Sequence, residues 1–400
     1  MKGKKILLLG GSPQQVPVIS RAKELGLETI LIDYLPDNPG KEIAHKWYQE
    51  STTDIETVYR IAREEAVAGI LAYASDPAAL PAAIVAERLE LPTNPAKSVE
   101  ILGVKNKFRK FLRDNGFDCP GFIEFPADIP VEDLKKKLEN LSFPIVIKPT
   151  DSSGSKGVTK ISDLSHLGKA LDWASQYSKN KILIAEEFIE RGFPYLIGGD
   201  IFVEDSQIVL KGEMACIRDE KNSALIPVGK KWPSGLSESQ RDKIYNLLQD
   251  VIKSLGIKTG EFNIEIILGK DDTPYLLELG PRAGGNMIPI QLSDIYSVDL
   301  ITSNIKAALG GNTEIKPVEP QESFMTHVVH SNRDGIFRGI DFSEEIKPHI
   351  YRMVIYKKPG DVVEAFDGAG KALGILFMKF ENEEQTHGFL REIEKHIRLK

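Results

Sequence analysis

The chain has 400 residues and a formal net charge of −7, with 42% hydrophobic and 27% charged residues. This composition excludes a disordered or fibrous protein, and the acidic balance leaves no electrostatic footprint for nucleic acid. The length is too great for one ordinary core, so we expect two to four packed units.

The cysteines and the N-terminal segment bear on location. Only Cys119 and Cys216 are present, which excludes a disulfide framework and a cysteine zinc cluster and fits a reducing compartment. The first apolar run covers only residues 6–9, too short for a signal peptide, and no apolar stretch approaches the roughly 20 residues that cross a bilayer. We therefore expect a cytoplasmic protein with no membrane or nucleic-acid partner.

The first hundred residues alternate short apolar runs with amphipathic helical patterns. The predicted strands are 6–9, 29–33 and 69–73, and the predicted helices are 16–25, 55–65 and 77–89. This alternation predicts a parallel, doubly wound α/β sheet. Gly10, Gly11 and Asp33 suggest a dinucleotide-binding fold, but the turn lacks G-x-G-x-x-G, so NAD binding is not expected.

The later segments have an α+β pattern. A helix is predicted over 99–115, strands over 144–148 and 182–188 flank a polar helix over 164–177, and 200–203 pairs antiparallel with 208–215. A long helix over 237–254 precedes two strands, 261–268 and 275–279. A linker follows residue 313, and residues 323–400 combine strands with a terminal helix from about 383. The predicted fold class is thus a multidomain α/β and α+β protein.

Two glutamates are expected to meet across a hairpin. If the strands 261–268 and 275–279 fold symmetrically about Asp271 and Asp272, Glu265 lies directly opposite Glu278. Like charges at paired positions repel, and Mg²⁺ prefers one or two carboxylates together with substrate phosphates. The alternative is an exposed hairpin face with solvated glutamates; the nearby Arg282 favours the metal site.

A lysine ends the predicted strand 144–148 and precedes a loop rich in Ser and Gly. Lys148 supplies a point charge, and the loop offers a nest of backbone N–H groups for phosphate oxygens, although many surface loops share this composition. Lys156 within the loop either meets phosphate or is solvated, and no Walker loop occurs. The strand 182–188 ends in Glu186 and Glu187, either beside a hinge that offers its backbone to adenine or simply at a strand end.

In order, Asn106-Lys107 at a helix start, PIVIKP-TDSSGSKGV, ILIAEEFIE and EFNIEIIL…PYLLELGPRAGGN make the chain resemble the ATP-grasp superfamily. The resemblance implies a Rossmann-like preceding domain (1–104), a lid subdomain (105–190), a catalytic subdomain (191–314) and a small C-terminal mixed α/β domain (315–400).

The resemblance also implies a role for particular residues. Lys107 and Lys148 would contact ATP phosphates, and Glu265 and Glu278 would ligate Mg²⁺, with Mn²⁺ as an alternative. Arg282, with Lys148, would stabilise the transferred phosphoryl group. The lid loop would be Ser153, Gly154, Ser155, Lys156 and Gly157; the adenine contacts would be Glu186, Glu187 and Ile189; and the substrate contacts would be Gly10, Gly11, Ser12, Ser75, Asp76 and Asn286.

The implied activity is an ATP- and Mg²⁺-dependent ligase that activates a carboxylate as an acyl phosphate and joins it to an amine, releasing ADP and phosphate. Small amino-acid-like substrates are expected, and relatives are often homodimers. Gly280 departs from the family, because many members have asparagine there as a metal ligand; Asn286 could substitute. The alternatives are a bicarbonate-using carboxylase or purine-pathway ligase, and a nucleotide-binding regulator without turnover.

Overall fold

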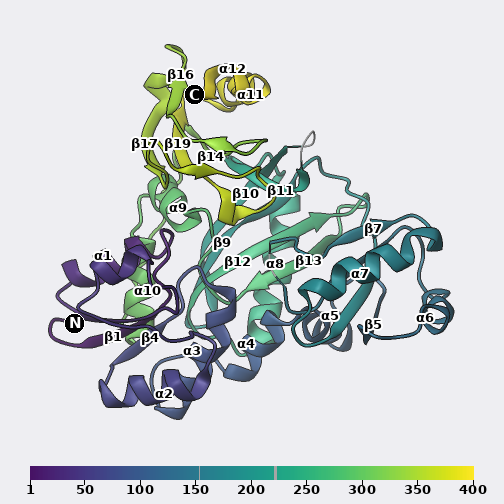
Figure 1. Cartoon of the computed structure of the whole chain (residues 1–400), viewed down its shortest axis with the longest axis horizontal. Helices are drawn as coiled ribbons and strands as arrows, with labels where there is room; N and C mark the ends of the chain where they lie inside the picture. Colours follow the sequence, from purple (N-terminus) through teal and green to yellow (C-terminus); the bar gives the residue numbers. More distant parts are fainter. Residues whose placement is uncertain (153, 220–222) are drawn as a thin grey trace.

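A computed structural model of the chain describes residues 1–152, 154–219 and 223–400. These residues form a mixed α/β protein with several sheets, which confirms the predicted fold class. Figure 1 shows a parallel sheet with its helices near the N-terminus, a smaller sheet beside α7, and a long sheet that reaches from the middle of the molecule to the C-terminal strands. No helix in the described part of the chain has both the length and the apolar character needed to cross a membrane.

The N-terminal residues form a parallel sheet in the order β3-β2-β1-β4. Its strands are β1 (Lys5–Leu9), β2 (Glu28–Ile32), β3 (Lys46–Tyr48) and β4 (Gly69–Leu71), and its helices are α1 (Val16–Glu24), α2 (Ile55–Glu64) and α3 (Asp76–Arg88). Leu7 and Leu9 pack against α2 and α3, whereas Ile6 and Leu8 pack against α1. Burial on both faces explains the continuous apolar runs. The three residues of β3 are too short a pattern to predict.

The predicted helix 99–115 is two helices. They are α4 (Ala96–Gly103) and α5 (Lys105–Asp114), separated by Val104 in an extended conformation (φ −127°, ψ 112°). The backbone N–H of Lys105 donates to Thr150 O (2.9 Å), so the first turn of α5 is held against the loop that follows the next sheet's second strand. Local periodicity carries no information about a contact with a residue 45 positions away, so the pattern predicted one helix where the structure has two.

A four-stranded antiparallel sheet follows, in the order β5-β8-β6-β7. Its elements are β5 (Phe122–Pro126), α6 (Val131–Leu138), β6 (Ile145–Pro149), β7 (Thr159–Ile161), α7 (Leu167–Tyr177) and β8 (Ile182–Glu187). Ile145, Ile147, Leu183 and Ala185 pack against α6 and α7. Because side chains alternate along a strand, Lys148 and Glu186 project from the opposite face.

The long sheet has eight antiparallel strands in the order β13-β12-β9-β10-β11-β14-β19-β17. The strands are β9 (Leu196–Glu204), β10 (Gln207–Asp219), β11 (Ser223–Trp232), β12 (Gly260–Leu268), β13 (Pro274–Gly280), β14 (Ser323–Val329), β17 (Ile350–Ile355) and β19 (Gly374–Phe380). Helix α8 (Glu238–Ser254) packs on one face, and α9 (Ile288–Tyr296) and α10 (Leu300–Ala308) lie on the other. The predicted antiparallel pairing of 200–203 with 208–215 is confirmed.

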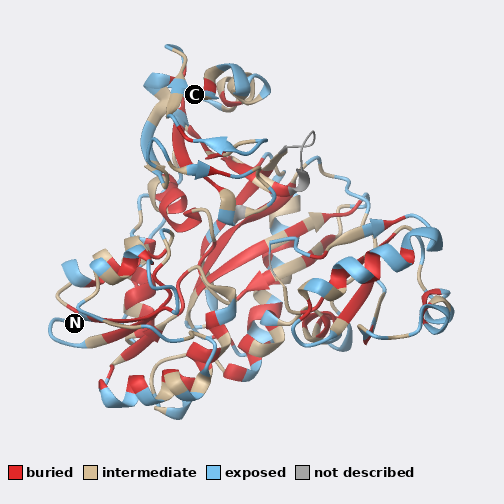
Figure 2. Ribbon diagram, in the orientation of Figure 1, coloured by how far each residue is buried: buried red, intermediate tan, exposed pale blue. Residues whose placement is uncertain are grey.

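The last eighty residues extend this sheet. Strands β14, β19 and β17 continue it beyond β11, so residues on both sides of the predicted boundary at 315 contribute strands to one sheet. The remaining elements are β15 (Gly335–Ile336), β16 (Ile340–Phe342), β18 (Val362–Val363), α11 (Glu383–Arg391), α12 (Ile393–His396) and β20 (Ile397–Leu399). Figure 2 shows burial concentrated in the strands and on the inner faces of the helices.

Candidate functional site

The two predicted metal ligands face each other across the hairpin β12–β13. Glu265 pairs with Glu278 in the ladder, as expected. The assumed symmetrical turn is wrong, however, because a β-bulge falls between Glu265 and Ile266, and Ile266 pairs with Leu276. The extra residue is Leu277. Without this bulge, Leu277 would stand opposite Glu265, since one residue of slip moves each side chain of the strand to the other face.

The bulge also decides which side chains reach the core. Leu276 and Leu279 are buried against α8, whereas Leu277 and Glu278, which lie between them, both line a large cavity. Strict alternation along the strand 275–279 predicts Leu277 and Leu279 together on the face opposite to Glu278. The structure corrects the position of Leu277, because a bulge interrupts the two-residue period at that point.

The glutamate pair is suited to a divalent cation. Burial and the neighbouring charge of Glu278 both raise the pKa of Glu265, so a bound cation would relieve an electrostatic cost that the two carboxylates share. Among the described residues, no group of three or more His, Cys, Asp or Glu side chains gathers that could hold a metal. Two carboxylates, completed by phosphate oxygens and water, match the preference of Mg²⁺. The residues present therefore fit this ion.

Gly280, the position at which the resemblance predicts an asparagine, leaves space for an arginine. A Cβ atom at position 280 would lie 3.4 Å from Cζ of Arg282, and an asparagine side chain would extend further toward that guanidinium. The absence of a side chain at position 280 thus allows the Arg282 guanidinium to lie close to this backbone. Asn286, the predicted substitute ligand, does not line the cavity, and its backbone N–H donates to Gln14 Oε1 (2.7 Å).

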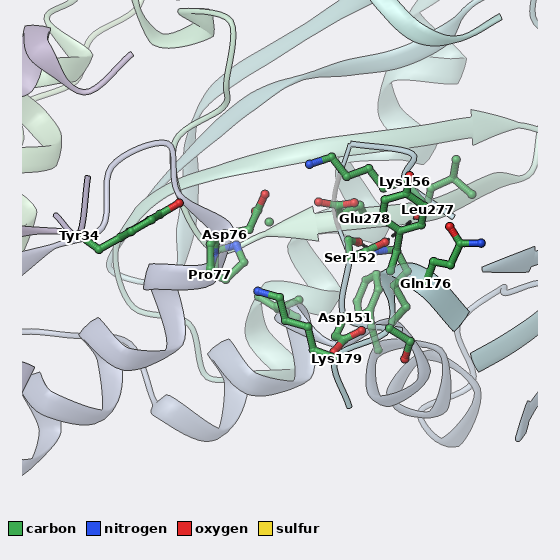
Figure 3. A pocket seen from close by; sticks show the side chains of 18 residues that line it. Tyr34, Asp76, Pro77, Asp151, Ser152, Lys156, Gln176, Lys179, Leu277 and Glu278 are labelled. Atoms are coloured by element: carbon green, nitrogen blue, oxygen red, sulfur yellow. Dashed lines mark hydrogen bonds between the residues drawn. The ribbon is translucent and has the colours of Figure 1, made fainter. Parts of the chain in front are cut away.

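Glu278 opens into a cavity of about 590 Å³ between the parallel sheet, α4 and α5, the loop after β6, and β13. Figure 3 shows Tyr34 and Asp76 on one side of it, and Lys156, Gln176 and Leu277 on the other. The lining residues are Tyr34, Asp76, Pro77, Leu102, Gly103, Lys105, Phe108, Asp151, Ser152, Lys156, Gln176, Tyr177, Ser178, Lys179, Leu277, Glu278, Gly280 and Pro281. Its size suits a nucleotide-sized ligand.

The lysine of α5 that lines the cavity is Lys105, which was not among the predicted phosphate contacts. Its Nζ donates to the backbone oxygen of Ser152 in the loop after β6, and its side chain lines the cavity. Lys107, which was predicted to contact phosphate, lies outside the cavity, forms an ion pair with Glu100 and has a side chain 42% exposed. The break at Val104 starts a new helix at Lys105 and thereby decides which lysine faces the cavity.

The lid loop connects β6 to β7. Gly154, Ser155 and Gly157 have positive φ angles of 68°, 59° and 74°. Such conformations can turn backbone N–H groups toward a common anion. A Cβ atom at Gly157 would lie 3.0 Å from Cδ of Pro149, so the loop passes close to the end of β6. Lys156 lines the cavity, and the predicted contact Ser153 lies outside the described residues.

Lys148 belongs to a buried charge cluster. Its Nζ lies 2.6 Å from Glu186 Oε2, and Nε of Arg109 lies 3.0 Å from Glu186 Oε1. Burial favours the neutral acid, but Arg109 and Lys148 outweigh it and lower the pKa of Glu186 to about 2. Burial lowers the pKa of Lys148 to about 8; Arg109 adds to this shift and Glu186 opposes it. The cluster therefore carries a surplus positive charge of one unit, which would attract a polyphosphate, but Lys148 is not among the residues that line the cavity.

The predicted adenine contacts do not line the cavity. Glu186 directs its carboxylate to Lys148 and Arg109, Glu187 accepts from the backbone N–H of Ser142 (2.8 Å), and Ile189 lies in the half-buried connection after β8. Because both carboxylates already have partners, the candidates for contact with a base are the backbone groups of the connection after β8.

Arg282 is held by a carboxylate of helix α3. Its Nε donates to Asp76 Oδ1 (2.6 Å), and Asp76 lies in the first turn of α3 on the cavity wall. Burial opposes ionisation of Asp76, but Arg282 lowers the pKa of its carboxyl below the ordinary value. Of the other predicted substrate contacts, Gly10, Gly11, Ser12 and Ser75 follow β1 or β4 and do not line the cavity.

Comparisons with known proteins match part of the chain to a domain family. Residues 141–290 match the family model described as an ATP-grasp domain. Among curated proteins, the carbamoyl phosphate synthase large chain of Pseudothermotoga lettingae is 25% identical over 302 residues, which are 70% of this chain but only 26% of that protein. The formate-dependent phosphoribosylglycinamide formyltransferase of Sulfurisphaera tokodaii is 24% identical over 94% of this chain and 97% of its own length.

Two solved structures share the fold over the full chain. The L-amino acid ligase from Bacillus licheniformis superimposes with a TM-score of 0.83 at 22% identity, covering 100% of this chain and 99% of that one. The phosphoribosylglycinamide synthetase from Anaerococcus prevotii superimposes with a TM-score of 0.80 at 20% identity and covers 100% of both chains. At these identities the likeness concerns the fold.

Proposed function

Because residues 141–290 match an ATP-grasp domain, we propose that the chain is an ATP- and Mg²⁺-dependent ligase that activates a carboxylate and joins it to an amine. The observation that carries the proposal is the pairing of Glu265 with Glu278, because Glu278 lines a cavity that Lys105 and Lys156 also line. Carboxylates that attract a cation and lysines that attract phosphates are the two halves of a metal–nucleotide site.

In the proposed reaction an oxygen of the substrate carboxylate attacks the γ-phosphorus of ATP, and the bond to ADP breaks. The amine then attacks the acyl carbon, phosphate leaves with the bonding electrons, and the amine nitrogen loses a proton. Glu265 and Glu278 would hold Mg²⁺, which supplies neutralisation of phosphate charge. No protein nucleophile is required, since positioning and electrostatic stabilisation dominate phosphoryl transfer.

The proposal gives the lysines and Arg282 separate roles. Lys105, Lys148 and Lys156 bind phosphate oxygens, and Lys105 takes the place first given to Lys107. Arg282, positioned by Asp76, stabilises the charge of the transferred phosphoryl group or acyl phosphate at the boundary between the nucleotide and the N-terminal domain. The substrates would enter along the side of the cavity formed by Tyr34 and Asp76.

The proposed carboxylate and amine are amino-acid-like, because the L-amino acid ligase shares the fold over the full chain. The alternative is a purine-pathway ligase or a bicarbonate-using enzyme, favoured by the full-length match to the formate-dependent formyltransferase. Release of ADP with paired amino acids supports the first, and ADP release that depends on bicarbonate, formate or a ribonucleotide amine supports the second. Binding of Mg·ATP without ADP release across all these substrates would instead indicate a regulator.

The glutamate pair is tested by Glu278→Gln. We expect ADP formation to fall by about 100-fold or more, as for loss of a major electrostatic group in an active site, with unchanged folding by circular dichroism. Asp250→Asn, on an exposed position of α8, is the matched carboxylate-to-amide control and should behave as wild type. Wild-type turnover in Glu278→Gln would remove the two-glutamate metal site.

A further inference from the structure

Arg109 on α5 is completely buried, and its guanidinium contacts two separate strands, β13 and β8. The side chain is 0% exposed. Its Nη1 donates to the backbone oxygen of Leu276 (3.0 Å), and its Nη2 donates to the backbone oxygen of Leu277 (3.0 Å). Its Nε forms the ion pair with Glu186 described above. A buried guanidinium without partners would be strongly unfavourable, so these contacts determine where the side chain can lie.

The two carbonyl groups belong to the bulge of β13. Leu277 is the extra residue that has no partner on β12, and Leu276 precedes it. An extra residue in a strand leaves its backbone groups outside the regular ladder, so they need other partners. A planar guanidinium presents its two terminal N–H groups at a fixed separation and spans both consecutive carbonyls at once. Arg109 therefore stabilises the backbone that brings Glu278, and not Leu277, opposite Glu265.

The same guanidinium fixes the phosphate lysine. Glu186 lies between Arg109 and Lys148, with N–O distances of 3.0 Å and 2.6 Å. Removal of Arg109 would leave Glu186 to neutralise Lys148 completely, and the surplus positive charge beside the nucleotide would disappear. Helix α5 also carries Lys105 one turn earlier, so one helix is tied to the lid loop, the charge cluster and the metal hairpin.

We propose that Arg109 is a positioning residue that sets the alignment of the metal carboxylates and holds the phosphate lysine in the same rigid unit. The inference rests on the proposed metal–nucleotide site. It assigns Arg109 no contact with substrate, because the side chain does not line the cavity.

The test uses the full-length variants Arg109→Met and Arg109→Lys. Arg113→Met is the matched control, since Arg113 lies one turn further along the same helix but pairs at the surface with Asp114 and is 56% exposed. Binding of Mn²⁺ in the presence of ADP is measured by electron paramagnetic resonance, binding of ADP without metal by calorimetry, and folding by circular dichroism.

We expect Arg109→Met to weaken Mn²⁺ binding at least tenfold and to weaken metal-free ADP binding as well. Arg109→Lys keeps a charge beside Glu186 but cannot span both carbonyls, so it should weaken Mn²⁺ binding while metal-free ADP binding stays within about twofold of wild type. This separation distinguishes positioning of the hairpin from general loss of structure. Arg113→Met should match the wild type in both measurements.

Wild-type Mn²⁺ affinity in a folded Arg109→Met or Arg109→Lys protein would overturn the proposal. If neither variant folds while Arg113→Met does, Arg109 is a stabilising residue of the core only, which also overturns it. Failure of the wild-type protein to bind Mn²⁺ with ADP would be a different result, because it would overturn the proposed function and this inference with it.

Discussion

The charge cluster around Glu186 predicts a large and specific loss of stability in Glu186→Gln. The substitution leaves the buried cations Arg109 and Lys148 without the carboxylate that they share. The two cations lower the pKa of Glu186 from its ordinary value of 4.5 to about 2. At about 1.4 kcal/mol per pKa unit, the folded state gains roughly 3 kcal/mol from the ionised group at neutral pH. Loss of one partner of a buried ion pair typically costs about 3–5 kcal/mol, which agrees.

The measurement is urea unfolding at pH 7, where we expect Glu186→Gln to lower the free energy of unfolding by about 3 kcal/mol. A depressed carboxyl pKa stabilises the folded state above the ordinary value and loses this effect as pH falls toward the folded value. The difference between wild type and variant should therefore shrink between about pH 4.5 and pH 2.

The neighbouring Glu187→Gln is the matched control for this experiment. Its carboxylate accepts one backbone hydrogen bond from Ser142 and is half-buried, so the expected loss is about 1 kcal/mol. Adding Lys148→Met to Glu186→Gln removes the excess cation and should recover part of the stability. A loss in Glu186→Gln below about 1 kcal/mol, or equal to that of Glu187→Gln, would refute the assignment of Glu186 as the shared counter-ion.

Three further variants test the proposed site. Lys148→Ala should weaken ATP binding by about tenfold or more. The ATP affinity of the wild type should fall as the pH rises past about 8, where Lys148 loses its proton. If Lys148→Ala showed the same pH dependence as the wild type, the phosphate contact would be contradicted. Asp76→Asn should lower kcat more than ATP affinity, because Arg282 loses its charged partner; an unchanged kcat at saturating substrate would exclude that role. Gly280→Asn should also lower kcat by displacing Arg282, whereas faster turnover in ADP-release assays would mean that a metal ligand had been restored.

Much of the candidate site could be predicted from local pattern. The alternation of β12 places Phe262 and Ile264 in the core and Glu265 on the other face, and the apolar strand β6 ends at Lys148 before the Ser/Gly loop. These properties depend on residues adjacent in the chain, because side-chain direction in a strand has a period of two. Local pattern was also sufficient for the parallel sheet, the long helix α8 and the fold class.

Arg109 carried a signal that was available but not used. It lies on the same helical face as Phe108 and Leu112, which are buried, so a charged residue there had to find a buried partner. The sequence alone does not say which partner, because Glu186 and the carbonyls of Leu276 and Leu277 lie 77 or more positions away along the chain.

The hairpin separates what the sequence by itself determined from what the tertiary structure decided. Local alternation placed Glu265 on the face away from the core, and the turn residues placed a second strand beside it. The bulge at Leu277 decided that Glu278 meets Glu265, and the contact between Lys105 and Thr150 helped decide that Lys105 and not Lys107 enters the cavity. Periodicity is a property of the chain geometry, whereas a one-residue shift of register or a helix break is settled by contacts between segments far apart in the sequence.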